Sequence, residues 1–177
     1  RPGRAGLEGL HELGLPPGVL EPLLDRKEVP VTDRSERAIL NHLIETCKDA
    51  ERGFRHVAEH VMDPTIKALF LDIASERGRF AADLLPHAQR LGGANAHDGT
   101  AVGALHRTWI DLRSALTKGD PIAALHEAER GEHFSMGVYR DALESMLPPT
   151  VRDVVEAQFQ QLQRTGERLH ALQAVRG

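Results

Sequence analysis

Residues 43–84 read LIETCKDAERGFRHVAEHVMDPTIKALFLDIASERGRFAADL, and this stretch decides the fold. On both sides of Asp63-Pro64, apolar residues recur at alternating steps of three and four, which is the pattern of helices with one buried face. Aspartate is a preferred N-cap, and proline is favoured at the first helical position. The stretch therefore predicts two long helices joined by a tight turn at Asp63.

Similar start and stop signals mark the other helix ends. The first helix opens with the capping-box pattern Asp33-Arg34-Ser35-Glu36, and Asp120-Pro121 repeats the aspartate–proline start further along the chain. Together these signals predict helices over 34–62, 64–91, 121–147 and about 151–175.

The connection between the second and third helices is much longer than a turn. It contains the loop GGANAHDG at 92–99 and a shorter helix around 100–117. Two hairpins joined by a long crossover form the ferritin-like arrangement, in which the second and third helices run parallel. We therefore expect an all-α, ferritin-like four-helix bundle over 34–177, with a helical crossover.

Residues 1–33 form an N-terminal extension that is rich in leucine and interrupted by Pro16-Pro17-Gly18. Two interpretations stay open for it. The segment is either a pair of short amphipathic turns, docked on the bundle or on a partner and followed by a linker, or a partly disordered extension.

Composition narrows the class of protein. The net charge is −4, and no stripe of Lys and Arg suggests nucleic acid as a partner. No apolar run is long enough to span a membrane. The single cysteine, Cys47, excludes an intrachain disulfide, which favours a cytoplasmic location, while the first residue, Arg1, favours a processed or truncated product.

Four glutamates occupy positions in the apolar seams of the helices. They are Glu51 in the first helix, Glu76 in the second, and Glu129 and Glu132 in the third. Glutamate is seldom buried without a partner, so these positions are candidates for a functional site.

The glutamates also fall at similar heights. Glu51 lies twelve residues before Asp63 and Glu76 thirteen after it, and Glu132 lies eleven residues after Pro121. At a rise of ~1.5 Å per residue, these three carboxylates share one layer, provided that the third helix starts at the end where Asp63 lies. Glu129 is one turn away from that layer.

Such a layer has two interpretations. Carboxylates from facing helices can bridge two iron or manganese ions, whose charge offsets their mutual repulsion. Alternatively, the layer holds no metal and fixes the register of the helices. Its carboxylates are then solvated through the end of the bundle or paired with arginines such as Arg77 or Arg79.

Three segments resemble an uncharacterised bacterial family of ferritin-like bundles of unknown function. They are the stretch quoted above, GALHRTWIDLRSALTKGD at 103–120 and EAERGEHFSMGVYRDALE at 127–144, and the resemblance covers roughly 38–173. It implies distant similarity to rubrerythrins and ferritins. By this similarity, Glu51 and Glu76 of this chain would match the first two di-iron glutamates of those proteins. Glu129 and Glu132 would match the ExxE motif of their third helix.

The chain also departs from the ligand set of those relatives. Arg79 stands where the second helix would carry a histidine, and Leu162 and Thr165 stand where the fourth would carry Glu and His. Because two imidazoles and one carboxylate are missing, the resemblance implies the fold more strongly than oxygen-activating di-iron chemistry.

Other residues have two interpretations each. Cys47 is a core residue or a metal or redox group, and His56 and His60, one turn apart, are a surface metal pair or solvated histidines. Glu167 and His170 form a literal ExxH, but the seam turns Glu167 toward the surface.

Two functions follow from these patterns. The first is a metal-binding protein in stress or metal handling, holding iron or manganese through Glu51, Glu76, Glu129 and Glu132. The second is a non-catalytic helical interaction or oligomerisation module with a vestigial polar layer. A homodimer is the expected assembly, since ferritin-like bundles often pair through helix faces.

Overall fold

A computed structural model describes residues 31–92 and 120–176. The expected crossover helix and most of the N-terminal extension lie outside these residues. Apart from Val31, the described residues belong to one compact unit, Thr32–Gly177.

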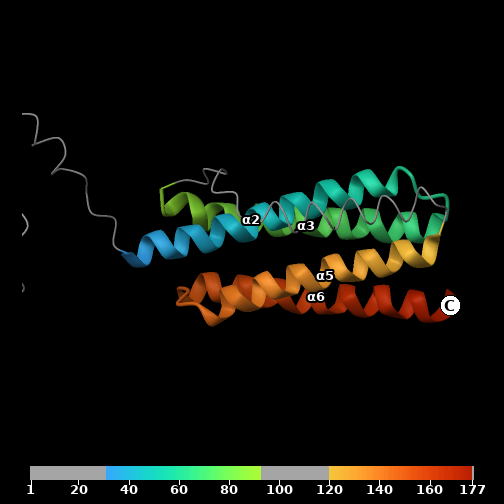
Figure 1. The fold of residues 1–177 in the computed structure, drawn as a ribbon. Helices are drawn as coiled ribbons and strands as arrows, with labels where there is room; N and C mark the ends of the chain where they lie inside the picture. The colour runs from blue at the N-terminus through green and yellow to red at the C-terminus, as the bar shows by residue number, and fades with distance from the viewer. Residues whose placement is uncertain (1–30, 93–119, 177) are drawn as a thin grey trace, which may run out of the picture. The chain divides into compact units, whose positions relative to one another are not determined.

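Four long helices make up the described part of the chain, which contains no strand. They are α2 (Val31–Ala58), α3 (Pro64–Arg90), α5 (Pro121–Glu144) and α6 (Pro149–Arg176). They pack as two hairpins, α2 with α3 and α5 with α6 (Figure 1). The predicted all-α four-helix bundle is confirmed.

The two hairpins are arranged so that α3 and α5 run in the same direction (Figure 1). The end of α3 and the start of α5 therefore lie at opposite ends of the bundle, and the connection 93–119 joins those ends. This is the parallel second and third helix pair that the long crossover predicts.

Aspartates cap α3 and α5 as their sequences predict. The carboxylate of Asp63 accepts hydrogen bonds from the backbone N–H groups of Thr65 (2.9 Å) and Ile66 (3.1 Å). Asp120 accepts from Ile122 and Ala123 in the same way. Because a proline follows each aspartate, both helices start with one fewer unpaired N–H group.

Asp63 also connects the two hairpins. The guanidinium of Arg176, at the end of α6, donates to both carboxylate oxygens of Asp63, with 3.3 Å between Nη2 and Oδ1. Together with the cap hydrogen bonds, Arg176 lowers the pKa of Asp63 below its usual value.

Several helix ends differ from the predicted ones. At its start, α2 begins at Val31, before the expected capping box, and it ends at Ala58 rather than Met62. The turn tightens there because the N–H of His60 donates to the carbonyl of Val57, three residues back.

In the second hairpin, α5 ends at Glu144 rather than Leu147, since Ser145 adopts an extended backbone with ψ of 165°. Helix α6 begins at Pro149, two residues before the expected start. Met146, which lies within the predicted helix 121–147, therefore follows the end of α5 and is 89% exposed.

The apolar core consists of two clusters along the bundle axis. One includes Phe54, Phe70 and Leu125, and the other includes Leu43, Leu84 and Leu162. Between them, the seam positions carry Glu76, Glu132 and Thr165, with Arg77 beside them. The polar residues thus divide the apolar core into two parts.

Candidate functional site

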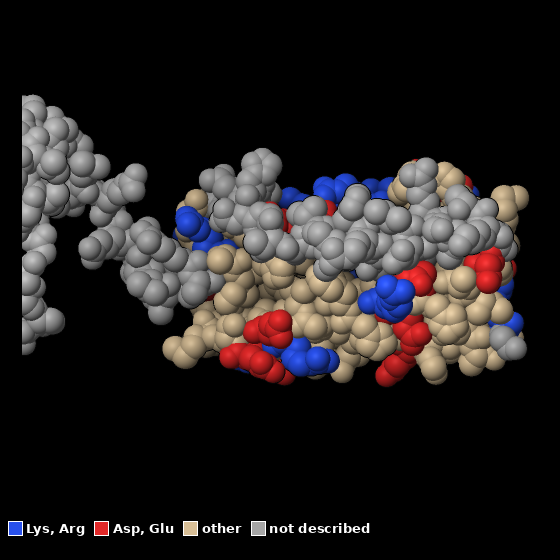
Figure 2. All heavy atoms as spheres, viewed as in Figure 1, with Lys and Arg blue, Asp and Glu red and all other residues tan. Residues whose placement is uncertain are grey.

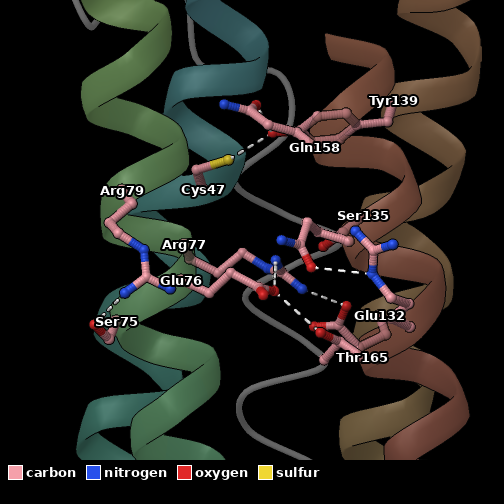
Figure 3. Close-up of polar contacts among 12 residues, drawn as sticks. Cys47, Ser75, Glu76, Arg77, Arg79, Glu132, Ser135, Tyr139, Gln158 and Thr165 are labelled. Carbon is pink, nitrogen blue, oxygen red and sulfur yellow. Dashed lines mark hydrogen bonds and ion pairs between the residues drawn. The ribbon is translucent and has the colours of Figure 1, made fainter. Parts of the chain in front are cut away.

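Arg77 lies at the centre of the polar layer. Its side chain is 1% exposed and extends from α3 across the bundle interior (Figure 3). Its Nη1 is 2.8 Å from Oε1 of Glu76, and its Nη2 is 2.6 Å from Oε2 of Glu132 on α5. One guanidinium therefore joins two of the four glutamates that the seams singled out.

The other helices add support to this cluster. Thr165 of α6 donates a hydrogen bond from Oγ1 to Oε1 of Glu76 at 3.0 Å. The guanidinium carbon of Arg77 lies 5.1 Å from the centre of the Phe80 ring, which favours a cation at this position. We call Arg77, Glu76, Glu132 and Thr165 the arginine–glutamate cluster; it draws on α3, α5 and α6.

Burial and charge act against each other in this cluster. For Arg77, burial alone would lower the pKa, but Glu132 and Glu76 outweigh burial and raise the pKa above its usual value. For Glu132, burial raises the pKa above 4.5, although Arg77 opposes that shift. Arg77 therefore stays a cation, while Glu132 is easier to protonate than an exposed glutamate.

Two polar atoms of the cluster have unused hydrogen-bonding capacity. Oε1 of Glu132 and Nε of Arg77 are buried, and no hydrogen-bond partner for either is found among the described residues. Such groups raise the free energy of the folded state, since each has lost its contact with water. The cluster is well paired in charge but incompletely satisfied in hydrogen bonds.

Glu51 lies at the predicted height but outside the cluster. Its carboxylate rests against Gly78 of α3, where an added Cβ would come within 3.0 Å of it, and Arg55 donates to its Oε1 at 2.8 Å. Its side chain is 26% exposed. The absence of a side chain at Gly78 leaves room for this carboxylate.

Glu129 pairs with α6 instead of with the other glutamates. Its Oε2 accepts a hydrogen bond from Nε2 of Gln173 at 3.1 Å, and its Oε1 lies 3.3 Å from Nδ1 of His170. Glu167 is exposed, as its position outside the seam predicts. The contact between His170 and Glu129 was not predicted, because it depends on how α5 and α6 pack.

The four glutamates are therefore divided among three surroundings. Arg77 holds Glu76 and Glu132, Arg55 holds Glu51, and α6 holds Glu129. In the described part of the chain no three of these carboxylates lie close enough together to hold one metal ion, and the Arg77 cation stands between Glu76 and Glu132. The arrangement does not fit a shared di-iron centre, and iron or manganese binding by these residues stays a prediction.

A second polar chain crosses the bundle near the cluster. Tyr139 of α5 donates its hydroxyl to Oε1 of Gln158 on α6 at 2.8 Å (Figure 3). Gln158 in turn donates from Nε2 to the carbonyl of Phe80 at 3.2 Å. Sγ of Cys47 lies 3.1 Å from the Tyr139 oxygen. Since the tyrosine proton is used on Gln158, the thiol is the donor in that contact.

Cys47 is buried, and its contact with Tyr139 explains its role. Burial raises the pKa of its thiol to about 11, so the group is protonated at neutral pH. The thiolate, and not the thiol, is the nucleophile and metal ligand. The geometry favours the interpretation of Cys47 as a core residue that hydrogen-bonds to Tyr139.

The seam pattern did not predict that Arg77 lies inside the bundle. The alternative of arginine-paired carboxylates named both Arg77 and Arg79. In the structure Arg77 is buried, whereas Arg79 is exposed and reaches Ser75 on its own helix at 3.3 Å. The available signal was spacing, since Arg77 lies four residues after Ile73 and three before Phe80, both buried.

Replacing Arg77 removes the cation that two carboxylates share. We expect Arg77→Met to lower the free energy of unfolding by about 3–5 kcal/mol, because it leaves Glu132 buried without a partner. Chemical denaturation of both proteins measures this loss. Arg79→Met, two residues away on the exposed face, is the matched control, and equal losses in the two variants would contradict the assignment.

The raised pKa of Glu132 predicts a pH dependence. The folded chain binds more protons at this residue than the unfolded chain, so the contribution of Glu132 to stability falls as the pH rises above 4.5. Glu132→Gln removes that dependence. We expect the unfolding free energy of the wild type, minus that of Glu132→Gln, to decrease between pH 4.5 and neutrality.

Urea unfolding of both proteins over that pH range measures this difference. A difference that increases with pH would mean that Arg77 outweighs burial and lowers the pKa of Glu132.

Comparisons with known proteins give a family but no activity. No curated protein is detectably similar to the chain. Residues 36–145, which are more than half of the chain, match the model of a family described as a domain of unknown function, DUF2383. The chain, with its arginine–glutamate cluster, belongs to this family.

Proposed function

We propose that this chain is a non-catalytic helical module that acts by self-association, in which Arg77 takes the place of a metal charge. The observation that carries the proposal is the pairing of Arg77 with both Glu76 and Glu132 inside the bundle. A guanidinium is a permanent cation, so it neutralises carboxylates without an ion. The parallel α3 and α5 support descent from a ferritin-like ancestor (Figure 1).

The surface offers a face for contact between two copies. A groove of about 470 Å³ runs between α3 and α6. Each helix lines it with residues at i, i+3, i+4 and i+7, which form one continuous helix face. They are Thr65, Ala68, Leu69 and Asp72 of α3, and Arg168, Ala171, Leu172 and Val175 of α6.

This α3–α6 face is mostly apolar but carries one charge of each sign. Arg168 and Asp72 lie 3.2 Å apart across the groove, and both are largely exposed. Val175, at one end of the face, is 84% exposed. The face shown in Figure 2 carries small groups of charged side chains of both signs among uncharged residues.

The charges favour a second copy as the occupant of the groove. In a two-fold symmetric dimer the same face packs against itself. Asp72 of each copy can then pair with the partner's Arg168, which gives two equivalent ion pairs. A face with one acid and one base is complementary to itself in this way, whereas a face of a single sign would repel its copy.

We expect the chain to be a dimer that Val175→Asp together with Ala171→Glu converts into a monomer. The two changes place acidic groups in an apolar contact, and both positions are exposed, so folding is preserved. Analytical ultracentrifugation measures the assembly. Ala157→Glu, an exposed alanine elsewhere on α6, is the control and leaves the dimer intact.

A wild-type chain that stays monomeric at high concentration would overturn self-association. A dimer that the double variant leaves unchanged would overturn the choice of the α3–α6 face.

A second candidate is iron or manganese binding by Glu51, Glu76, Glu129 and Glu132. The buried Oε1 of Glu132 favours it, since this potential ligand atom has no hydrogen-bond partner among the described residues. Binding would require Arg77 to leave its two carboxylates. A cytoplasmic location is compatible with either candidate.

Metal analysis separates the two candidates. The protein is purified without chelator as the His56→Ala, His60→Ala variant, so that metal held by these two exposed imidazoles does not enter the measurement. We expect far less than one iron or manganese ion per chain. Stoichiometric metal that Glu132→Ala abolishes would overturn the role assigned to Arg77.

A further inference from the structure

Three metal-ligand side chains meet at the end of α2. His56, Glu59 and His60 each offer one ligand atom, and the three atoms lie within 4.8 Å of one another. In the described part of the chain this is the one group of three or more His, Cys, Asp or Glu side chains so arranged. The sequence had suggested His56 and His60 as a pair, and the turn after Ala58 adds the carboxylate of Glu59.

The orientation of His60 suits metal binding. Its Nδ1 lies 2.9 Å from the backbone carbonyl of His56. A carbonyl only accepts hydrogen bonds, so Nδ1 carries the proton and Nε2 presents its lone pair. Metal-binding histidines are commonly held by such a hydrogen bond from the second nitrogen, which sets the tautomer and orients the ring.

The charges around the group also favour a cation. Nδ1 of His56 lies 3.7 Å from Oε2 of Glu59, and the two imidazole rings are 4.9 Å apart. The group stands at the C-terminal end of α2, where the helix dipole attracts positive charge. The nearby Arg55 is paired with Glu51, so its charge is already balanced.

We propose that His56, Glu59 and His60 bind a divalent transition-metal ion, with zinc as the representative ion, at the tip of the first hairpin. Two imidazoles and a carboxylate are a donor set that zinc accepts in tetrahedral geometry. Three protein ligands leave a fourth position for water or for a ligand from another molecule. This site is separate from the glutamate layer and does not depend on self-association.

Zinc titration of the full chain, free of any histidine tag, tests the site by isothermal calorimetry. We expect the wild type to bind one zinc ion per chain at this site and His60→Ala to weaken that binding at least about tenfold. His133→Ala is the matched control. His133 is also exposed and makes the same hydrogen bond from Nδ1 to a carbonyl four residues back, at 3.0 Å. Within the described ranges it belongs to no such group of three.

Glu59→Gln tests the carboxylate, because it keeps the shape of the side chain and removes its charge. It weakens zinc binding if all three residues are ligands. The proposal is overturned if the wild type fails to bind zinc, or if His60→Ala and His133→Ala bind it equally. Circular dichroism checks that each variant is folded. Ultracentrifugation of each variant without zinc checks that its oligomeric state equals that of the wild type, so that a loss of zinc binding is not caused by a loss of the dimer.

Discussion

The ion pair between Arg77 and Glu132 is the contact on which the arrangement of the bundle depends. Both side chains are almost completely shielded from water, and 2.6 Å separates Nη2 from Oε2. A buried charge is tolerated only beside a partner of opposite sign. The relative height of α3 and α5 is therefore restricted to positions that bring these two side chains together, a constraint that apolar packing alone does not impose.

The rest of the interior follows from that restriction. The arginine–glutamate cluster separates two apolar clusters, so each half of the core packs against a polar layer. Thr165 connects α6 to this cluster through its hydrogen bond to Glu76. In a neighbouring layer, the contacts from Cys47 to Tyr139 and from Tyr139 to Gln158 connect α2, α5 and α6. The side chains of the bundle pair the charges in its interior. Metal binding and contacts with other molecules are therefore more accessible on its surface.

Much of the fold was predictable from local rules. The caps at Asp63 and Asp120 depend on neighbouring backbone groups, and the seams depend on helical periodicity, so both could be seen in the sequence. The helix ends were less predictable, since the extended Ser145 and the tightened turn after Ala58 reflect a balance of weak hydrogen bonds. The exposure of Met146 follows from one of those ends. Iron or manganese binding, homodimer formation and a cytoplasmic location stay predictions.

The sequence by itself determined that four amphipathic helices form two hairpins and that glutamates enter the seams at similar heights. Those properties follow from spacing along the chain, which a helix converts directly into direction and height. Only the tertiary structure decided what surrounds each carboxylate: Arg77 rather than Arg79 pairs with Glu132, Gly78 leaves room for Glu51, and His170 lies beside Glu129. Long side chains have many rotamers, and the neighbouring helices determine which one is adopted. The spacing of residues along the sequence does not determine where those helices lie.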